Sequence, residues 1–415
     1  MASSGPDQSG RNVSSIPDPL EHEVNEAYKK RGIPGLKEAV ERKLNLWKTV
    51  PLNIAITGDS GAGKSCYINA LRGMTADDKE AAPVGVVQTT AEVKQYPHPE
   101  HKNLILWDLP GVGTPEFTRD SYLAKTNFER YDFFLVFTSC RFTENDMWLA
   151  QQIRQTGKSF YFIRTKIDSD ISNNKQSHPR THSRVQVLHT VRSDCMNQLQ
   201  NKGFTIPEVF IISNFDVNEF DFGQLSERLI QDAPDIKREA LTLSLTILTE
   251  NIIRAKESYL RKRIFIVSIA SAAAAAVPIP GVEYVVDTAI LLKETEFYRK
   301  QLRLDNTSVQ ENAAALNISL SELQKRLNLE SQTIPGTARG LLAFFVSLQL
   351  STIAKTVLKV ALPFVSWKIS SGLSYGVQVF CLNNILDIMV NDALRINAAM
   401  NIVFARNTME VIQRT

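Results

Sequence analysis

The chain has 415 residues, of which 43% are hydrophobic and 22% are charged, and its net charge at pH 7 is +3. At about 150 residues per domain, this length predicts two or three domains or one elongated domain, and the composition excludes wholesale disorder. The weak positive charge argues against a dedicated nucleic-acid-binding protein. The four cysteines lie far apart without a C-x-x-C pair, so we expect no disulfide scaffold and no structural zinc. We therefore expect the protein to reside in a reducing compartment.

The N-terminal part changes from a polar segment to a helical pattern. Residues 1–20 are rich in Ser, Gly, Pro and Asp, which predicts a disordered tail. In residues 21–50, apolar side chains recur at spacings typical of helices, and Pro34 with Gly35 is expected to divide this stretch into two helices.

Residues 51–237 alternate between short apolar runs and helical patterns. The apolar runs predict strands. They occupy residues 52–57, 104–107, 133–138, 160–164 and 209–213. The helical patterns occupy residues 66–71, 146–155 and 184–200. This alternation predicts an α/β domain with a mostly parallel sheet.

Residues 238–415 show no convincing strand alternation, so we interpret them as a helical domain. Its helices are expected to break at residues 278–281, at residues 335–336 and at Pro363, because proline cannot continue a helix. We expect the helices of residues 21–50 to pack with this domain.

The strongest local signal is a glycine-rich pattern, G-x4-G-K-[ST], at residues 58–65. It lies between a predicted strand and a predicted helix, which is the context of a Walker A phosphate loop. Glycines allow backbone N–H groups to surround phosphate oxygens, and the helix presents its positive end. Lys64 is expected to reach the β- and γ-phosphates, and Ser65 to ligate Mg²⁺. The other residues expected at the phosphates are Gly58, Asp59, Ser60, Gly61, Ala62, Gly63 and Cys66.

Asp108 and Gly111 form a D-x-P-G pattern directly after a predicted strand. In D-x-x-G elements of nucleotide hydrolases, the Asp holds Mg²⁺ through water and the glycine N–H senses the γ-phosphate. A strand that ends in such a turn is common, but its position after the phosphate loop favours the nucleotide-binding interpretation.

Thr165, Lys166 and Asp168 fit [NT]-K-x-D, a guanine-specificity pattern. Guanine offers two donors, N1–H and N2–H₂, that one carboxylate can accept together, whereas adenine offers no such pair. Losing both charge-assisted hydrogen bonds would cost on the order of 3–6 kcal/mol. The stem of Lys166 is expected to pack on the base, and Ser213 and Asn214 are placed to give backbone amides to guanine O6.

Two further positions bear on catalysis. A threonine must close over the γ-phosphate and Mg²⁺, and of Thr89 and Thr90 we favour Thr90. Val112 follows Gly111, where small signalling GTPases carry a water-orienting Gln, and valine cannot orient water. Either hydrolysis is slow, or Gln88 or a partner protomer supplies this function; an ordinary solvated loop residue is the alternative for Gln88.

These motifs and several longer strings resemble the immunity-related GTPases, an interferon-inducible, dynamin-like family. The strings that carry the resemblance are residues 58–65, 107–111, 131–134, 160–171, 212–214, 220–222 and 229–234. The resemblance implies a Ras-like P-loop GTPase domain with a mostly parallel sheet, plus an all-helical domain formed from both chain ends. It also implies GTP or GDP and Mg²⁺ as ligands, and Lys64 resembles the Lys-bearing, effector-like subclass.

The same resemblance implies partners and a location. GTP-bound protomers would dimerise or oligomerise and hydrolyse GTP cooperatively. They would be cytoplasmic and partly associated with ER, Golgi or vacuole membranes, in cell-autonomous innate immunity against vacuolar pathogens. Ala2 stands where some relatives carry a myristoylated glycine. The alternative function is a slow or non-hydrolysing GTP-dependent switch or scaffold that regulates related GTPases.

Two apolar segments raise the question of membrane contact. Residues 264–282 carry no charge, but alanines and prolines leave an apolar helix of only about 14 residues, which favours a buried helix over an interfacial or spanning one. Residues 341–361 combine apolar bulk with Lys355 and Lys359, which suits a helix in a headgroup layer. A buried helix explains this second segment equally well, yet we prefer it for reversible membrane contact.

Overall fold

A computed structural model describes residues 18–85, 92–204, 208–246, 248–275, 282–337, 340–341, 344 and 369–413. The chain divides into two compact units. The sheet unit comprises Leu46–Lys256, Gln301–Asn328 and Val390–Thr415, and the helical unit comprises Met1–Asn45, Glu257–Lys300 and Leu329–Met389. This division differs from the limits expected from the sequence, and those limits stay a prediction.

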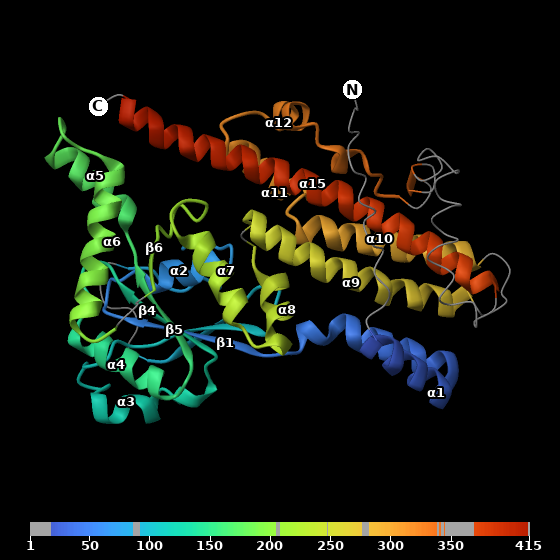
Figure 1. Ribbon diagram of the computed structural model, residues 1–415, viewed down its shortest axis with the longest axis horizontal. Helices are drawn as coiled ribbons and strands as arrows, with labels where there is room; N and C mark the ends of the chain where they lie inside the picture. Colours follow the sequence, from blue (N-terminus) through green and yellow to red (C-terminus); the bar gives the residue numbers. More distant parts are fainter. Residues whose placement is uncertain are drawn as a thin grey trace, which may run out of the picture. The chain divides into compact units, whose positions relative to one another are not determined.

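The sheet unit contains a six-stranded sheet with the order β2-β3-β1-β4-β5-β6. Figure 1 labels β1, β4, β5 and β6 of this sheet. Its strands are β1 (Leu52–Gly58), β2 (Lys94–Pro97), β3 (Leu104–Asp108), β4 (Phe133–Thr138), β5 (Ser159–Arg164) and β6 (Val209–Ile211). All neighbouring pairs are parallel except β2 with β3. The register places Gly58 beside Phe137 and Thr138 beside Arg164, so the loops that follow these strands start at one edge of the sheet.

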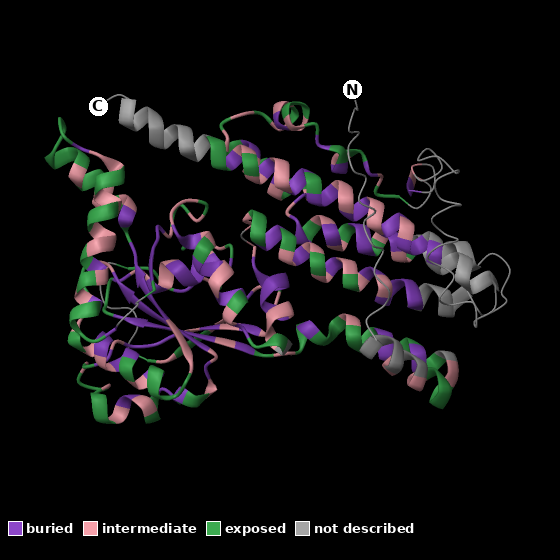
Figure 2. Ribbon diagram, viewed as in Figure 1, coloured by how far each residue is buried: buried purple, intermediate pink, exposed green. Residues whose placement is uncertain are grey.

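Helices cover both faces of this sheet, which explains why its central strands β1, β4 and β5 are largely apolar. One buried cluster joins the sheet to α2 (Lys64–Leu71), α7 (Phe222–Asp232) and α8 (Asp235–Ser244). A second cluster joins it to α3 (Arg119–Lys125), α4 (Glu144–Gln155) and α6 (Arg184–Asn201). Every residue of β4 is buried, and Figure 2 shows the central strands in the colour of buried residues. The predicted α/β domain with a mostly parallel sheet is confirmed.

Further helical segments complete the sheet unit. They include α5 (Ile167–Ser177), α11 (Asn306–Ala315) and α12 (Leu320–Leu327), with 3₁₀ turns at Leu46–Lys48 and Phe128–Arg130. The buried Lys256 donates hydrogen bonds to the carbonyls of Leu245 (2.7 Å) and Gln301 (2.9 Å). Burial lowers the pKa of Lys256 to about 7. The hydrogen bonds of Lys256 thus connect three positions beyond residue 237 within this unit, namely Leu245, Lys256 and Gln301.

The helical unit draws on both ends of the chain. It contains α1 (Asp18–Asn45), a 3₁₀ turn at Glu330–Thr333 and most of α9 (Glu250–Ala275), α10 (Val282–Gln301) and the first part of α15 (Ile369–Gln413). Arg263 of α9 donates to the Leu44 carbonyl (3.0 Å) and pairs with Glu294 of α10 (2.7 Å). A helical region formed from both chain ends is thereby confirmed.

The break in α1 lies at Gly32, whose φ of 61° is left-handed. It is not at the expected Pro34 and Gly35, because Pro34 occupies the first turn after the break, where proline is tolerated. The expected breaks at residues 278–281 and at Pro363 lie outside the described residues. Residues 335–336 are not helical, as expected.

The described part of the first apolar segment belongs to α9 and is largely buried, from Ile264 to Ile269. This burial agrees with the expectation of a core helix. Residues 276–281 and most of residues 341–361 lie outside the described part of the chain. Among the described helices, none combines the length and apolarity needed to span a membrane.

Candidate nucleotide-binding site

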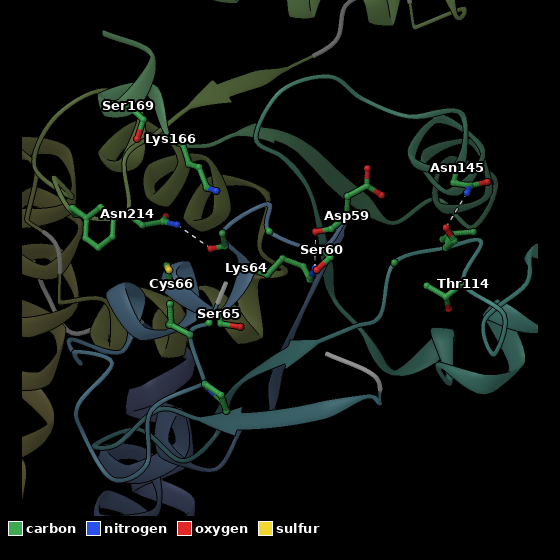
Figure 3. A pocket seen from close by; sticks show the side chains of 18 of the residues that line it. Asp59, Ser60, Lys64, Ser65, Cys66, Thr114, Asn145, Lys166, Ser169 and Asn214 are labelled. Atoms are coloured by element: carbon green, nitrogen blue, oxygen red, sulfur yellow. Dashed lines mark hydrogen bonds between the residues drawn. The ribbon is translucent and has the colours of Figure 1, made fainter. Parts of the chain in front are cut away.

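A cavity of about 590 Å³ opens beside the loops that follow β1, β3, β5 and β6 (Figure 3). This is the edge of a parallel sheet at which ligands bind in open α/β folds. The cavity is lined by Asp59, Ser60, Gly61, Gly63, Lys64, Ser65, Cys66, Pro83, Val84, Gly85, Gly111, Val112, Gly113, Thr114, Asn145, Lys166, Asp168, Ser169, Asn214 and Phe215. The predicted residues Gly58, Ala62, Asp108, Thr165 and Ser213 are buried next to these lining residues.

The conformation of the phosphate loop requires glycine at two positions. Gly58 has a φ of 133°, and a Cβ there would lie 2.0 Å from the carbonyl oxygen of Phe137. Gly63 has a φ of 85° and forms the N-cap of α2. The first turn of α2 therefore follows directly on a left-handed residue, and its N-terminus faces the cavity that Gly63 and Lys64 line.

Lys64 is 6% exposed, and its ammonium donates to the backbone carbonyls of Gly58 (2.8 Å) and Asp59 (3.0 Å). Burial lowers the pKa of Lys64, while Asp108, Asp59 and Asp146 act in the opposite direction. The ammonium thus lies at the cavity wall, hydrogen-bonded to two neutral carbonyl oxygens. Phosphate oxygens would offer it stronger, charge-assisted hydrogen bonds.

Ser65 and Asp108 come together at the same end of the cavity. The Ser65 hydroxyl donates to a carboxylate oxygen of Asp108 at 3.3 Å, and Asp108 is 2% exposed. A hydroxyl and a carboxylate are hard oxygen ligands, which Mg²⁺ prefers, so the donor set fits this ion. Gln88, Thr89 and Thr90 lie outside the described residues.

The D-x-P-G loop is held from both sides. The Tyr122 hydroxyl donates to the Pro110 carbonyl at 3.0 Å and lies 3.0 Å from the Thr57 hydroxyl. Burial raises the pKa of Tyr122, so the hydroxyl keeps its proton. A Cβ on Gly111 would lie 3.2 Å from the Gly58 carbonyl oxygen, which shows how closely this loop approaches the phosphate loop.

Asn145 of α4 is a cavity residue that the sequence motifs did not indicate. Its amide donates to the Val112 carbonyl at 2.9 Å (Figure 3). Its oxygen accepts from Arg119 at 2.8 Å. The Val112 side chain is 8% exposed and belongs to an apolar cluster. Asn145 therefore holds the backbone beyond Gly111 in place, while Val112 contributes packing.

Asp146, the next residue of α4, closes the N-terminus of that helix. Its carboxylate accepts from the Thr143 backbone N–H (2.8 Å) and hydroxyl (2.9 Å) in a capping box. Burial raises the pKa of Asp146 to about 6, and its charge also interacts with Asp59 and Lys64. Asp146 is thus one of three acidic residues, with Asp59 and Asp108, whose charges interact with Lys64.

The T-K-x-D loop is fixed to the phosphate loop. The Thr165 hydroxyl donates to the Ala62 carbonyl at 2.7 Å, and the Asn214 amide donates to the Gly63 carbonyl at 2.9 Å. Lys166 has a φ of 60° and forms the N-cap of α5, which places Asp168 in the first turn of that helix. Lys166 and Asp168 both line the cavity.

The cysteine of the phosphate loop and the loop after β6 complete the wall. Cys66 lines the cavity, and burial raises the pKa of its thiol. The buried Ser213 hydroxyl accepts the backbone N–H groups of Phe215 and Asp216, both at 3.3 Å. Ser213 therefore stabilises the turn of this loop without lining the cavity, whereas Asn214 and Phe215 line it.

A doubly wound parallel sheet, a Walker A loop, a D-x-P-G loop and a T-K-x-D loop meet at one cavity. This combination defines a P-loop GTPase with a Ras-like sheet. The family model for interferon-inducible GTPases matches residues 20–396. The chain belongs to the interferon-inducible GTPase family, which confirms the resemblance found in the sequence. It is a GTP hydrolase and binds guanine nucleotides.

Individual relatives agree with this assignment. T-cell-specific guanine nucleotide triphosphate-binding protein 2 of Mus musculus is 40% identical over 289 residues, which cover 69% of each chain. Interferon-inducible GTPase 5 of Rattus norvegicus is 33% identical over 375 residues, covering 89% of this chain and 80% of the relative. Among solved structures, Aquifex aeolicus Era aligns over 52% of this chain and 67% of Era at 16% identity, with a TM-score of 0.29. The family assignment rests on the sequence matches.

Proposed function

We propose that this GTPase is a nucleotide-gated protein that self-associates on GTP and acts in interferon-induced innate immunity. The observation that carries the proposal is the convergence of the phosphate, D-x-P-G and T-K-x-D loops on one cavity. Membership of the interferon-inducible family supports the immune role. The defence of cells against vacuolar pathogens is the specific role that we infer from this family.

In the proposed site, each residue has a distinct task. Lys64 and the backbone N–H groups of residues 59–66 bind the phosphates and neutralise their charge. Ser65, Asp108 and Thr90 hold Mg²⁺, which when bound neutralises charge on the β- and γ-phosphates. Asp168 accepts the two donors of guanine, and Lys166 packs on the base. Gly111 donates its N–H towards the γ-phosphate.

GTP hydrolysis at this site also needs a group that orients the attacking water. Val112 is a buried aliphatic residue, and its carbonyl is already bound by Asn145. We propose that self-association supplies the function, either by positioning Gln88 or by contributing a group from a second protomer. Turnover per molecule then rises with protein concentration.

The test is GTP turnover per protein molecule across a hundredfold range of protein concentration. The proposal expects turnover that rises with concentration and that Lys64→Ala abolishes. Tight GTP binding with flat, near-zero turnover would instead favour the alternative, a slow switch that regulates related GTPases.

We further propose that the GTP-bound protein associates with intracellular membranes through residues 341–361. Replacing Leu342, Phe345 and Leu348 by Glu is then expected to abolish co-sedimentation with liposomes in GTP. A lower melting temperature of this variant would indicate instead that the segment is a core helix.

A further inference from the structure

Phe215 exposes an aromatic ring at the wall of the nucleotide cavity. Its side chain is 81% exposed, whereas the other exposed large apolar residues of the described chain lie between 37% and 55%. Phe215 lines the cavity together with Lys166, Asp168, Ser169 and Asn214, which we call the guanine end. The most exposed large apolar side chain described here thus lies where the base is expected.

The loop that carries Phe215 has a fixed backbone. The Phe215 and Asp216 N–H groups donate to the Ser213 hydroxyl, and Asn214 donates to the Gly63 carbonyl of the phosphate loop at 2.9 Å. The residue just before the ring is therefore anchored to the loop that binds phosphate. A ring on a fixed backbone loses little conformational entropy when a ligand covers it.

The chemistry of the guanine end identifies what covers the ring. Asp168 reads the edge of a guanine, which leaves the two flat faces of the base to be covered by other groups. Lys166 comes from the β5–α5 loop and Phe215 from the β6–α7 loop, so the two side chains reach the cavity from different loops. When an aromatic side chain stacks on a base, one face of the ring and one face of the base are removed from water.

We propose that Phe215 stacks on the guanine base and sets the affinity of this GTPase for its nucleotide. The proposal rests on the placement of the base given under Proposed function. Stacking uses the face that every base has, whereas Asp168 reads the hydrogen-bonding edge. Phe215 therefore raises the affinity for guanine and xanthine nucleotides equally and leaves the choice between them to Asp168.

The experiment is the dissociation constant of GDP, measured by titration calorimetry, for wild type and Phe215→Ala. We expect binding to weaken by about 5- to 100-fold, the range known for single base–aromatic stacks. In the Asp168→Asn background, Phe215→Ala is expected to weaken binding of xanthosine diphosphate by the same factor. Phe215→Tyr retains a ring and is expected to restore GDP binding to within about threefold of wild type.

Val185→Ala is the matched control, since Val185 is a 55% exposed apolar residue of α6 that does not line the cavity. We expect it to leave GDP binding unchanged. The melting temperature of ligand-free Phe215→Ala is expected to match wild type, because an exposed ring contributes little to folding. A weaker GDP affinity that accompanies a lower melting temperature and is not restored by Phe215→Tyr would overturn the proposal.

Two other results would also overturn it. GDP affinity in Phe215→Ala equal to wild type means that the base does not stack on the ring. Unchanged affinity with a lost concentration dependence of turnover means that the ring contacts a second protein molecule. Failure of wild type itself to bind GDP would refute the nucleotide site as a whole, which distinguishes that failure from a failure of stacking alone.

Discussion

The two ends of the nucleotide cavity are held together in different ways. At the guanine end, Thr165 and Asn214 donate to carbonyls of the phosphate loop, at 2.7 and 2.9 Å, and thereby brace the loops that carry Asp168 and Phe215. At the phosphate end, which comprises residues 59–66 and 108–114, Lys64 itself donates to backbone carbonyls. At the guanine end, the residues that hold the loops together are therefore not the ones that bind the base. At the phosphate end, Lys64 does both: it holds the loop and is expected to bind phosphate.

This difference predicts how each end responds to nucleotide. At the guanine end the bracing hydrogen bonds can persist when the base binds, so recognition is preorganised. At the phosphate end, phosphate oxygens compete with the carbonyls of Gly58 and Asp59 for the Lys64 ammonium. Binding there exchanges contacts, and an exchange of contacts is what couples a ligand to a change of conformation.

Base selectivity at the guanine end gives the largest expected effect. Asp168→Asn removes the negative charge and replaces one acceptor oxygen by an NH₂ donor, so the side chain can no longer accept both guanine donors. The preference for guanine over xanthine nucleotides is expected to change by about a hundred- to ten-thousand-fold. Competition between GDP and xanthosine diphosphate measures this change. If the preference stays within threefold of wild type, Asp168 does not read the base and the guanine end is wrongly placed.

The phosphate end should show the next largest effect. Lys64→Ala removes the cation of the phosphate loop and is expected to lower GTP turnover by about a hundred- to a thousandfold, as the loss of a single donor to developing charge does elsewhere. Lys158→Ala is the matched control, because Lys158 also donates to two backbone carbonyls, those of Glu129 (2.6 Å) and Phe128 (3.3 Å), outside the cavity. Equal losses of turnover in the two variants would mean that Lys64 acts through the fold alone.

Much of the fold could be predicted because its signals are local. β1, β3, β4 and β5 are largely buried apolar runs, and their predicted limits agree with the structure to within one residue. β2 was missed because Lys94–Pro97 is a four-residue edge strand that contains a proline. β6 ends at Ile211, two residues before its predicted end, and the next two residues begin the loop towards the cavity.

The site divides in the same way between local and tertiary signals. The phosphate, D-x-P-G and T-K-x-D motifs combine residue type with spacing, so the sequence alone indicates them. Asn145 and Phe215 reach the cavity only through the packing of α4 and of the loop after β6. Around Asn145 the only readable pattern is the helix start at Thr143 and Asp146, and that pattern does not indicate a contact with Val112.

Asp146, one of the acidic residues whose charge interacts with Lys64, predicts a dependence of stability on pH. Burial raises the pKa of Asp146 to about 6, above its usual 3.8, so folding favours the protonated form. Its stabilising contribution is complete below pH 3.8 and is lost as the pH rises through 6. The free energy of unfolding of wild type relative to Asp146→Asn should therefore increase by up to about 3 kcal/mol between pH 7 and pH 4.

Asparagine is a suitable replacement for Asp146 because its oxygen can still accept from the Thr143 N–H. Urea denaturation of both proteins at several pH values measures the difference. A difference that stays constant from pH 7 to pH 4 would mean that Asp146 titrates at its ordinary pKa, because the hydrogen bonds from Thr143 and the charge of Lys64 offset the effect of burial.

The brace at the guanine end gives the smallest expected effect and tests the comparison most directly. Thr165→Val keeps the shape of a fully buried side chain but leaves the Ala62 carbonyl without its donor at 2.7 Å. We expect a loss of about 1–3 kcal/mol in the free energy of unfolding. The preference for guanine over xanthine should be unchanged, because Asp168 remains.

Thr156→Val is the matched control, since the Thr156 hydroxyl donates to the Ile153 carbonyl at 2.7 Å away from the cavity. Both variants lose one such bond, but only the change at Thr165 should also weaken GDP binding. A change in base preference with normal stability would make Thr165 a recognition residue, and bracing and recognition would then coincide at both ends.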